Sequence, residues 1–487
     1  MPASQGPADI EIAGLSADSR TVQAGFLFAA LPGTKQDGRC FAADAVARGA
    51  VAILTDDPAA LTLSPETWGS LALVTDPNPQ RRLALMAARF HGGQPRNIAA
   101  VTGTNGKTSV VHFTREIWMA LGHPAASLGT LGLVTAAERR PGALTTPDPV
   151  ALHRDLAELM RQGIEHVAVE ASSHGLHQNR LDGLSVSAAA FTNLTRDHLD
   201  YHGDMAHYRA AKDRLFTTLL RPGGTAVLNC DSAEFARLAA LCRERSHPVI
   251  AYGVDPTADL QLVARDPRPR SQALVVQVFG QQQKLLLPLA GEFQAMNALA
   301  ALGLVIATGA PSAAATAALA NLTGVPGRMQ FVGSSESGGA IFVDYAHTPD
   351  ALSAILTALR PHARGNLAVL FGCGGDRDAG KRPLMGEVAS RLADRVYITD
   401  DNPRTEPATA IRRAILEAAP SAIEIDDRRS AIATAIAELA KDDLLIIAGK
   451  GHETGQIIGT ETYPFDDAAV AREFAGAQGS PSYRLAG

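Results

Sequence analysis

Cysteine is scarce in this sequence of 487 residues, and the few that occur are widely spaced. Cys40, Cys230, Cys242 and Cys373 form no C-x-x-C pair, the spacing that metal sites and redox motifs use. We therefore expect buried thiols in a reducing compartment rather than disulfides or metal ligands.

Long apolar runs are also missing. No uninterrupted run reaches the roughly 18 residues that a membrane-spanning helix needs. The first residues, MPASQGPADIEIAG, have neither the basic nor the apolar region of a secretion signal. We expect a cytoplasmic protein without a membrane span.

Positive charge is not in excess. Lys and Arg total 44 against 50 Asp and Glu, and the formal net charge is −6. Because a protein that binds along a nucleic acid must neutralise many phosphates, we expect no nucleic-acid partner. One small anionic ligand remains compatible with this charge. The length suggests roughly three domains of about 150 residues each.

A strand, a glycine turn and a helix follow one another in the segment NIAAVTGTNGKTSVVHFTREIWMAL, residues 97–121. Residues 98–102 are apolar or β-branched and predict a buried strand, whereas Val110, Phe113 and Ile117 recur at helical spacing. A glycine turn that opens a helix points backbone N–H groups at an anion. The segment therefore predicts a phosphate-binding loop.

The side chains of this loop suit the triphosphate of a nucleotide. Lys107 can reach phosphate oxygens, and Thr108 offers a hydroxyl to Mg²⁺. Val101 stands where the usual motif has a further glycine, so this is the shorter G-x-x-G-K-T form. An ordinary glycine-rich turn is the alternative. The residues expected to bind ATP are Gly103, Thr104, Asn105, Gly106, Lys107, Thr108 and Ser109.

Strands and helices alternate through most of the chain, which predicts an α/β protein with mostly parallel sheets. We predict a small α/β domain at 1–96, a central domain at 97–323 and a third α/β domain at 324–487. In the third domain, each strand candidate is followed by a polar or glycine-rich segment. Since open parallel sheets bind ligands at the carboxyl ends of their strands, these segments should line one crevice. The candidates are 340–346, 367–373, 395–401, 422–427 and 444–451.

Polar chemistry also follows two strands of the central domain. The apolar strand that begins at residue 166 ends on Glu170, where a carboxylate can bind Mg²⁺ beside the phosphate loop. The next strand, 186–194, leads to His198 and Lys212, and helical spacing places Lys212 on one face with Tyr208. A solvated turn acid, a capping or core histidine and a surface lysine are the respective alternatives.

Taken together, these segments resemble the Mur ligase family, and the resemblance extends over all three predicted domains. The loop GTNGKT alone would also admit folylpolyglutamate synthases, but the combined set is specific. The resemblance implies an N-terminal domain for the UDP end of a nucleotide-sugar peptide, a central ATPase domain and a C-terminal Rossmann-like domain. The matching segments are DSRTVQAGFLFAALPGTKQDGRCF, GTNGKTS, LTTPD, EASSHGL, FTNLTRDHLDYHG, YRAAKDRLF, the GRM around Arg328, DYAHTPDAL, GCGGDRDAGKRP, DDNPRTEP and AGKGHE.

The resemblance also implies roles for single residues. Ser19 matches a position near the uracil, and Lys212 matches a lysine that is carbamylated in the family and so supports a second Mg²⁺. Thr108, Glu170 and His198 become the other Mg²⁺ ligands. The remaining matches are Thr145, Thr146, Ser173 and Arg180 at the sugar-peptide, and Asn297, Arg328, Asp344 and His347 around the adenine, ribose and phosphates.

The segment DNPR discriminates within the family. It is similar to members that add meso-diaminopimelate to UDP-N-acetylmuramoyl-L-alanyl-D-glutamate, whereas lysine-adding members usually lack this arginine. An arginine fork suits the extra carboxylate, and Glu453 suits the distal ammonium. A plain turn would explain Asp-Asn-Pro but not the arginine after it. The implied pocket comprises Arg377, Asp401, Asn402, Pro403, Arg404, Gly449 and Glu453.

The expected reaction begins with attack of the D-glutamyl γ-carboxylate on the γ-phosphate of ATP. An amine of diaminopimelate then attacks the resulting acyl phosphate and expels phosphate. We expect Lys107, Lys212 and Arg328 to be the catalytic residues and the protein to be a monomer. The rival hypotheses are a lysine-adding homologue, a folylpolyglutamate-type ligase and a P-loop NTPase switch, which would hydrolyse ATP without an amino-acid acceptor.

Overall fold

The computed structural model describes residues 4–5, 10–33, 36–64 and 71–476. Its contacts divide the chain into two compact units. The first comprises Met1–Lys107, Gly122–Leu228 and Ser232–Val249, and the second comprises Thr108–Leu121, Asn229–Asp231 and Ile250–Gly487.

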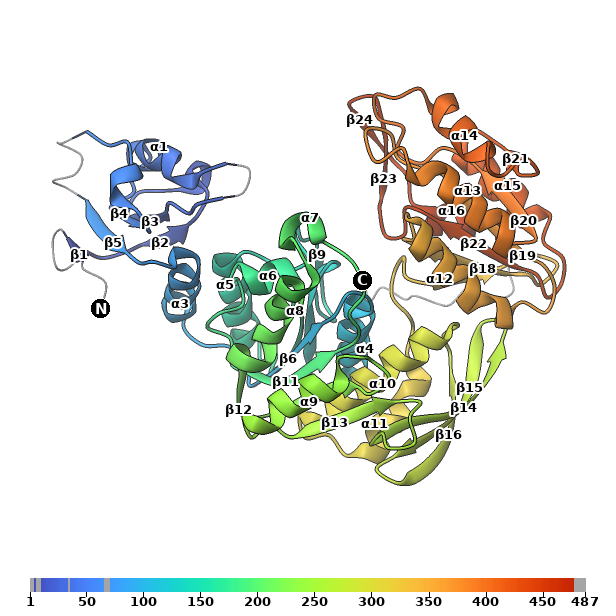
Figure 1. Ribbon diagram of the computed structural model, residues 1–487, viewed down its shortest axis with the longest axis horizontal. Coiled ribbons are helices and arrows are strands. Elements are labelled where there is room, and N and C mark those ends of the chain that lie inside the picture. Colours follow the sequence, from blue (N-terminus) through green and yellow to red (C-terminus); the bar gives the residue numbers. More distant parts are fainter. Residues whose placement is uncertain (1–3, 6–9, 34–35, 65–70, 477–487) are drawn as a thin grey trace. The chain divides into compact units, whose positions relative to one another are not determined.

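The first unit begins with a five-stranded sheet of order β1-β5-β4-β3-β2, in which β2 to β5 run parallel (Figure 1). Alternate residues of β3 face opposite sides: Phe28 packs with helix α1, whereas Leu27 packs with helix α3. This alternation places one helix on each face. The elements are β1 (Ser4–Gln5), β2 (Gly14–Ser16), β3 (Phe26–Ala29), α1 (Ala42–Ala47), β4 (Ala52–Thr55), β5 (Ala72–Thr75) and α3 (Pro79–His91).

A second sheet in this unit has the order β12-β11-β6-β10-β7-β8-β9, with β12, β11, β6, β10 and β7 parallel. Its strands are β6 (Asn97–Thr102), β7 (Ala125–Gly129), β8 (Gly132–Val134), β9 (Arg139–Arg140), β10 (His166–Glu170), β11 (Val186–Phe191) and β12 (Leu220–Asn229). Its helices are α5 (Pro149–Arg161), α6 (Ser173–His177), α7 (Leu199–His202), α8 (Met205–Arg214) and α9 (Phe235–Glu244).

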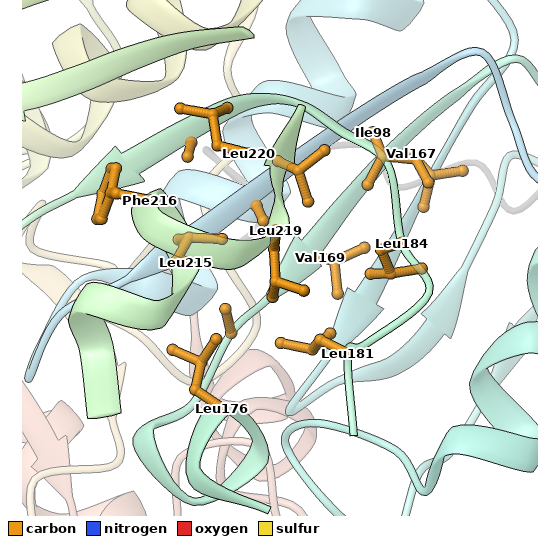
Figure 2. Packing of buried hydrophobic residues seen from close by; sticks show 14 of the residues in the cluster. Ile98, Val167, Val169, Leu176, Leu181, Leu184, Leu215, Phe216, Leu219 and Leu220 are labelled. Carbon is orange, nitrogen blue, oxygen red and sulfur yellow. The ribbon is translucent and has the colours of Figure 1, made fainter. Parts of the chain in front are cut away.

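The core of this sheet is aliphatic. Ile98, Val167 and Val169 of the central strands belong to one buried cluster with Leu215 and Leu219, which lie on a π-helical segment at Leu215–Leu219 directly after α8 (Figure 2). Burying a side chain of this size stabilises the fold by roughly 1.5–3 kcal/mol. The end of α8 is therefore anchored to the sheet.

The second unit contains helix α4, which begins directly after the glycine turn, and a run of antiparallel strands. Strand β14 pairs with β15, and β15 pairs with β16. The sequence predicted the β15–β16 hairpin but not β14, whose segment LQLVARDPR mixes charge and proline with few apolar residues. The elements are α4 (Lys107–Ala120), β13 (Val249–Gly253), β14 (Leu260–Arg268), β15 (Ser271–Val278), β16 (Gln281–Leu287), α10 (Glu292–Ala307) and α11 (Ser312–Ala318).

The same unit ends with a six-stranded sheet of order β17-β18-β22-β19-β20-β21, all parallel except β17. Along β22, Ile446 packs with α12, α13 and α14, whereas Leu445 and Ile447 pack with α15 and α16. Helices therefore cover both faces. The strands are β17 (Gln330–Ser334), β18 (Ala340–Asp344), β19 (Leu367–Phe371), β20 (Arg395–Ile398), β21 (Ile423–Glu424) and β22 (Leu444–Ala448).

The five predicted strands of the third domain are confirmed, each ending two or three residues before its predicted end. The polar segments lie together at the carboxyl edge of the sheet, as expected for parallel strands. A hairpin of β23 and β24 follows them. The remaining elements are α12 (Pro349–Leu359), α13 (Lys381–Leu392), α14 (Ala408–Leu416), α15 (Arg428–Ala437), β23 (Gly455–Ile458), β24 (Glu461–Pro464) and α16 (Asp467–Phe474).

Among the described residues, no helix has both the length and the apolar character to cross a membrane.

Candidate functional site

The glycine turn after β6 lies against the end of β11. Gly103 has φ +145°, and a Cβ there would collide with the Thr192 hydroxyl. The Asn105 N–H donates to Asn193 Oδ1 at 2.9 Å, and Thr104 Oγ1 donates to the Thr195 carbonyl at 3.2 Å. Only glycine fits at the first position, and the residues that follow β11 hold the turn in shape.

Two lysines converge on one carbonyl of this turn. Lys107 Nζ donates to the Gly103 oxygen at 3.0 Å and to the Thr104 oxygen at 2.8 Å, and Lys212 Nζ donates to the same Gly103 oxygen at 2.8 Å. Lys212 is 1% exposed and lies 4.4 Å from the centroid of the Tyr208 ring. Burial, and then the nearby charge of Lys107, lower the pKa of Lys212 well below its ordinary value. The site therefore favours a neutral amine.

Glu170 ends β10 as a buried acid. Its carboxylate accepts from the Thr130 N–H at 2.8 Å and from the Thr130 hydroxyl at 3.3 Å. A Cβ at Gly129 would collide with this carboxylate, so the glycine makes room for it. In the part of the chain that the structure describes, no three His, Cys, Asp or Glu residues gather as a metal cluster. Any metal site here thus needs other donors.

His198 lies on an exposed turn and has φ +54°. Its ring centroid is 4.8 Å from that of His174 and 6.3 Å from that of Tyr208. His174 also contacts Tyr201 and His202, and burial, followed by the charge of His174, lowers the pKa of His202 to about 4. Sequence reasoning assigned no role to His174, although it falls in the segment SSHG after Glu170.

The predicted sugar-peptide residues lie close to Glu170. The Thr146 hydroxyl donates to the Glu170 carbonyl at 2.7 Å, and Thr145 Oγ1 lies 3.1 Å from Thr130 Oγ1. Arg180 Nη1 donates to the Thr146 carbonyl at 2.8 Å, and burial lowers the pKa of Arg180. Ser173 is the first residue of α6. The structure therefore brings Thr145, Thr146 and Arg180 together.

Ser19 lies apart from these residues, in a short 3-10 helix at Ser19–Thr21 that packs near α1. It is buried, and a side-chain hydrogen bond from it is the largest of the contributions that lower the pKa of Asp44. Its predicted contact with a uracil stays a prediction.

In the second unit, Arg328 and Asp344 lie close together. Asp344 accepts from the Met329 N–H at 2.6 Å and from the Ala346 N–H at 2.8 Å. Burial nevertheless raises the pKa of Asp344, against the opposing charge of Arg328. The Arg328 guanidinium lies 4.6 Å from the Tyr345 ring centroid. An always-charged group is thus held over an aromatic face.

Asn297 and His347 are linked to the region of Arg328 and Asp344 through hydrogen bonds with neighbouring residues. Asn297 Nδ2 donates to Gln294 Oε1 at 3.1 Å, and Gln294 Nε2 donates to the Arg328 carbonyl at 3.3 Å. His347 is exposed, with Nδ1 2.9 Å from the Tyr345 carbonyl. All four predicted residues therefore belong to one region of the second unit.

The segments after β20 and β22 join around Asn402. Its side-chain oxygen accepts from Lys450 Nζ at 2.8 Å and from the Ile457 N–H at 3.0 Å, and its Nδ2 donates to Glu453 Oε2 at 3.1 Å. Gly449 has φ +114°, and a Cβ there would press on Asp401 Oδ2 at 2.7 Å. Sequence reasoning missed Lys450, although the segment AGKGHE contains it.

Arg404 has φ +52° and reaches back to the segment after β19. Its Nη1 donates to the Gly375 carbonyl at 2.8 Å, and its backbone N–H donates to the Ile457 carbonyl at 3.1 Å. Pro403 between Asn402 and Arg404 is buried. Arg377 is exposed, and its guanidinium donates to the Asp376 carbonyl at 3.4 Å. The structure therefore gathers Asn402, Arg404 and Glu453 but does not place the Arg377 guanidinium among them.

Arg428 lies beneath this region, fully buried with Asp467. The two side chains form a bidentate pair, with both distances 2.7 Å. Arg428 also donates to the Ala448 carbonyl at 3.0 Å and to the Asp400 carbonyl at 3.3 Å. It thus ties together the chain after β20 and the end of β22.

Replacing Arg428 with methionine should lower the free energy of unfolding by about 3–5 kcal/mol, because Asp467 would stay buried without its partner. Urea denaturation followed by circular dichroism measures the loss. Arg429→Met is the matched control, since the neighbouring pair of Arg429 and Glu473 is about half exposed, and it should cost less than about 1 kcal/mol. Equal losses in the two variants would contradict this assignment.

The glycine loop follows a parallel strand and opens a helix, an arrangement typical of phosphate-loop α/β enzymes. Three consecutive stretches match known families: residues 11–90 match "Mur ligase family, catalytic domain", 101–305 match "Mur ligase middle domain" and 327–451 match "Mur ligase, glutamate ligase domain".

Similarity to individual proteins extends over nearly the whole chain. A UDP-N-acetylmuramoyl-L-alanyl-D-glutamate--2,6-diaminopimelate ligase of Bradyrhizobium diazoefficiens is 52% identical over 472 residues, with 96% of both chains covered. A protein of the same name from Caulobacter vibrioides is 52% identical over 467 residues, with 95% of both covered. A solved structure of a ligase of that name is 34% identical, with a TM-score of 0.72, and the match covers 95% of this chain and 94% of that one.

The chain belongs to the Mur ligase family. This confirms the resemblance, the α/β class with three domains, and the prediction that the protein is a ligase. The bounds 1–96, 97–323 and 324–487 stay a prediction, as do the roles of the individual site residues.

Proposed function

We propose that this chain adds meso-diaminopimelate to UDP-N-acetylmuramoyl-L-alanyl-D-glutamate, with ATP as the energy source, in peptidoglycan precursor synthesis. The observation that carries the proposal is the 52% identity, over nearly the full length, to ligases named for this reaction. The arrangement of Asn402, Arg404 and Glu453 supports the choice of acceptor, because it offers donors for a carboxylate and a carboxylate for an ammonium.

In the proposed reaction, the D-glutamyl γ-carboxylate attacks the γ-phosphorus of ATP. A carboxylate O–P bond forms, the bond to the bridging oxygen breaks, and ADP leaves with an acyl phosphate behind. An amine of diaminopimelate attacks the acyl carbon, and the tetrahedral intermediate loses phosphate and a proton. Because two anions must approach in the first step, Lys107 and Arg328 act mainly by positioning and neutralising charge.

Thr108, Glu170 and His198 would hold Mg²⁺ in this proposal. The hydroxyl and the buried carboxylate suit Mg²⁺, and the imidazole is the softer ligand of the set. When bound, Mg²⁺ would neutralise the phosphate oxygens. Glu170 supports this role because its carboxylate is buried at the carboxyl end of a parallel strand, where it is held by one residue of the neighbouring loop.

Carbamylation of Lys212 is also part of the proposal. A neutral amine is needed, since its lone pair forms the N–C bond with CO₂ and a proton leaves to solvent. The lowered pKa of Lys212, caused first by burial, supplies that neutral form. The product is an anion where a cation would otherwise stand, and it could support a second Mg²⁺. We further propose that the protein works in the cytoplasm as a monomer.

The amino acid that the enzyme accepts distinguishes the proposed function from its rivals. With ATP and the UDP-muramoyl dipeptide, we expect phosphate release to depend on an added amino acid and to be fastest with meso-diaminopimelate, compared with L-lysine and L-glutamate. Release that is equal with and without an acceptor would instead support an NTPase switch. A preference for lysine or glutamate would favour a lysine-adding or a folylpolyglutamate-type ligase.

Arg404→Leu should raise the KM for diaminopimelate about 10- to 100-fold, the effect of losing one or two hydrogen bonds to a charged group. The KM for ATP should stay within about twofold, because the phosphate loop is unchanged. Arg391→Leu is the control, since Arg391 is exposed on α13. An unchanged KM for diaminopimelate would remove Arg404 from the acceptor pocket.

A further inference from the structure

The amide of Asn402 can adopt only one orientation. The Ile457 N–H, 3.0 Å away, can only donate a hydrogen bond, and Lys450 Nζ at 2.8 Å also donates. The atom that faces them must therefore be the side-chain oxygen. The nitrogen then points to Glu453 Oε2, 3.1 Å away, which can only accept while ionised.

This orientation determines what Asn402 offers to a ligand. Two donors occupy its oxygen, and Glu453 takes one of the two N–H groups of its nitrogen. Among the residues that the structure describes, the second N–H has no protein acceptor. Asn402 can thus present a donor to a bound group, which suits a carboxylate and not an ammonium.

Lys450 adds charge to this geometry. Its side chain is 0% exposed, and Nζ lies 3.6 Å from Glu453 Oε2. A buried cation is screened little by water, so it acts through the amide on a bound anion and also balances part of the Glu453 charge. Burial lowers the pKa of Lys450, and the nearby Asp401 opposes that shift. Either protonation state keeps N–H groups that can donate to Asn402.

We infer that Lys450 is a positioning residue for acceptor choice: it fixes the Asn402 amide so that an N–H, beside the Glu453 carboxylate, faces an amino-acid end that bears both a carboxylate and an ammonium. The inference rests on the proposed function, because it takes the region around Asn402 as the acceptor pocket. It extends that function by assigning to Lys450 the orientation of the Asn402 amide, and therefore the donor that the pocket offers.

Lys450→Met tests this role in the full-length enzyme, with phosphate release as the assay. We expect the KM for meso-diaminopimelate to rise at least about tenfold. The KM values for ATP and for the UDP-muramoyl dipeptide should stay within about twofold. The KM for L-lysine should change less, because lysine lacks the distal carboxylate, so the preference for diaminopimelate over lysine should fall about tenfold. Lys441→Met, an exposed lysine of the same sheet region, is the control.

A double substitution separates positioning from a general loss of packing. Because Lys450 acts through Asn402, Lys450→Met should raise the KM for diaminopimelate at least about tenfold in the wild-type background but less than about twofold in an Asn402→Ala background. Full additivity would overturn the inference. If Lys450→Met does not fold, Lys450→Gln is the substitute. Glutamine keeps the site polar, but its side chain is one bond shorter than that of lysine, so its amide does not take the place of Nζ beside Asn402. An unchanged KM for diaminopimelate in Lys450→Gln would also overturn the inference.

The two proposals fail differently. If the wild-type enzyme does not use diaminopimelate, the proposed function is wrong. If the wild-type enzyme prefers diaminopimelate and Lys450→Met keeps both the KM and the preference, only the role of Lys450 is wrong.

Discussion

Lys107→Ala should reduce turnover by about 10²- to 10³-fold while leaving the fold intact. Loss of one preorganised group that stabilises developing charge costs about 10²–10³ in rate, and Lys107 is expected to face the transferred phosphoryl group. In the structure, its Nζ donates to the backbone carbonyls of Gly103 and Thr104, which belong to its own loop. Phosphate release with all three substrates measures the effect.

Lys284→Ala is the control for this variant. Lys284 is an exposed residue of β16, and its replacement should leave turnover unchanged. A melting temperature for Lys107→Ala close to that of wild type would show that folding is intact. Near-normal ligation by Lys107→Ala would remove the phosphate loop from the chemistry, and with it the proposed route through an acyl phosphate.

Local sequence pattern was enough to predict the strand, the glycine turn and the helix of this segment. The apolar run of β6, the glycine turn and the helical period of α4 lie within 25 consecutive residues, 97–121, and each leaves its own signal. Strands β18, β19 and β22 of the C-terminal sheet were predictable for the same reason, since they are short, buried on both faces and followed by polar segments. Because these strands pair in parallel, the polar segments that follow them lie at one edge of the sheet, and no further signal was needed to predict this.

Contacts between distant segments were not predictable in this way. Lys450 and Asn402 are 48 positions apart, and the hydrogen bond between them depends on the sheet order β22-β19-β20. Arg428 directly follows two aspartates in the sequence, yet it is fully buried against the distant Asp467. A single sequence shows residue types and spacing, but it does not show which charged side chains the sheet will enclose.

Lys212 was only partly predictable from the sequence. Helical spacing placed it on one face with Tyr208 and Phe216, and all three are buried. The sequence alone was equally compatible with the alternative, in which Lys212 is an exposed lysine on the helix surface. Packing decides the matter, because the π-helical turn after α8 anchors Leu215 and Leu219 in the core and thereby turns the lysine toward the Gly103 carbonyl.

Lys212→Met should abolish ligation, with a loss of at least about 10²-fold, and yet stabilise the fold at neutral pH. The activity is lost because methionine cannot form the carbamate. The stability gain follows from linkage. The folded-state pKa of Lys212 is lowered from 10.5 by burial and then by Lys107, so the unfolded state binds more protons between the two pKa values. Wild-type stability should therefore rise with pH through that window.

The advantage of Lys212→Met should be largest below the folded-state pKa and should disappear as the pH approaches about 10.5. Urea denaturation in CO₂-free buffer at several pH values measures it, and ¹³C NMR with ¹³C-bicarbonate detects the carbamate in wild type. A variant that is both inactive and less stable than wild type would point to a structural lysine. An inactive but more stable variant, together with a carbamate signal only in wild type, would instead support a carbamylated catalytic lysine. A lysine present for packing alone would not destabilise the fold in this way.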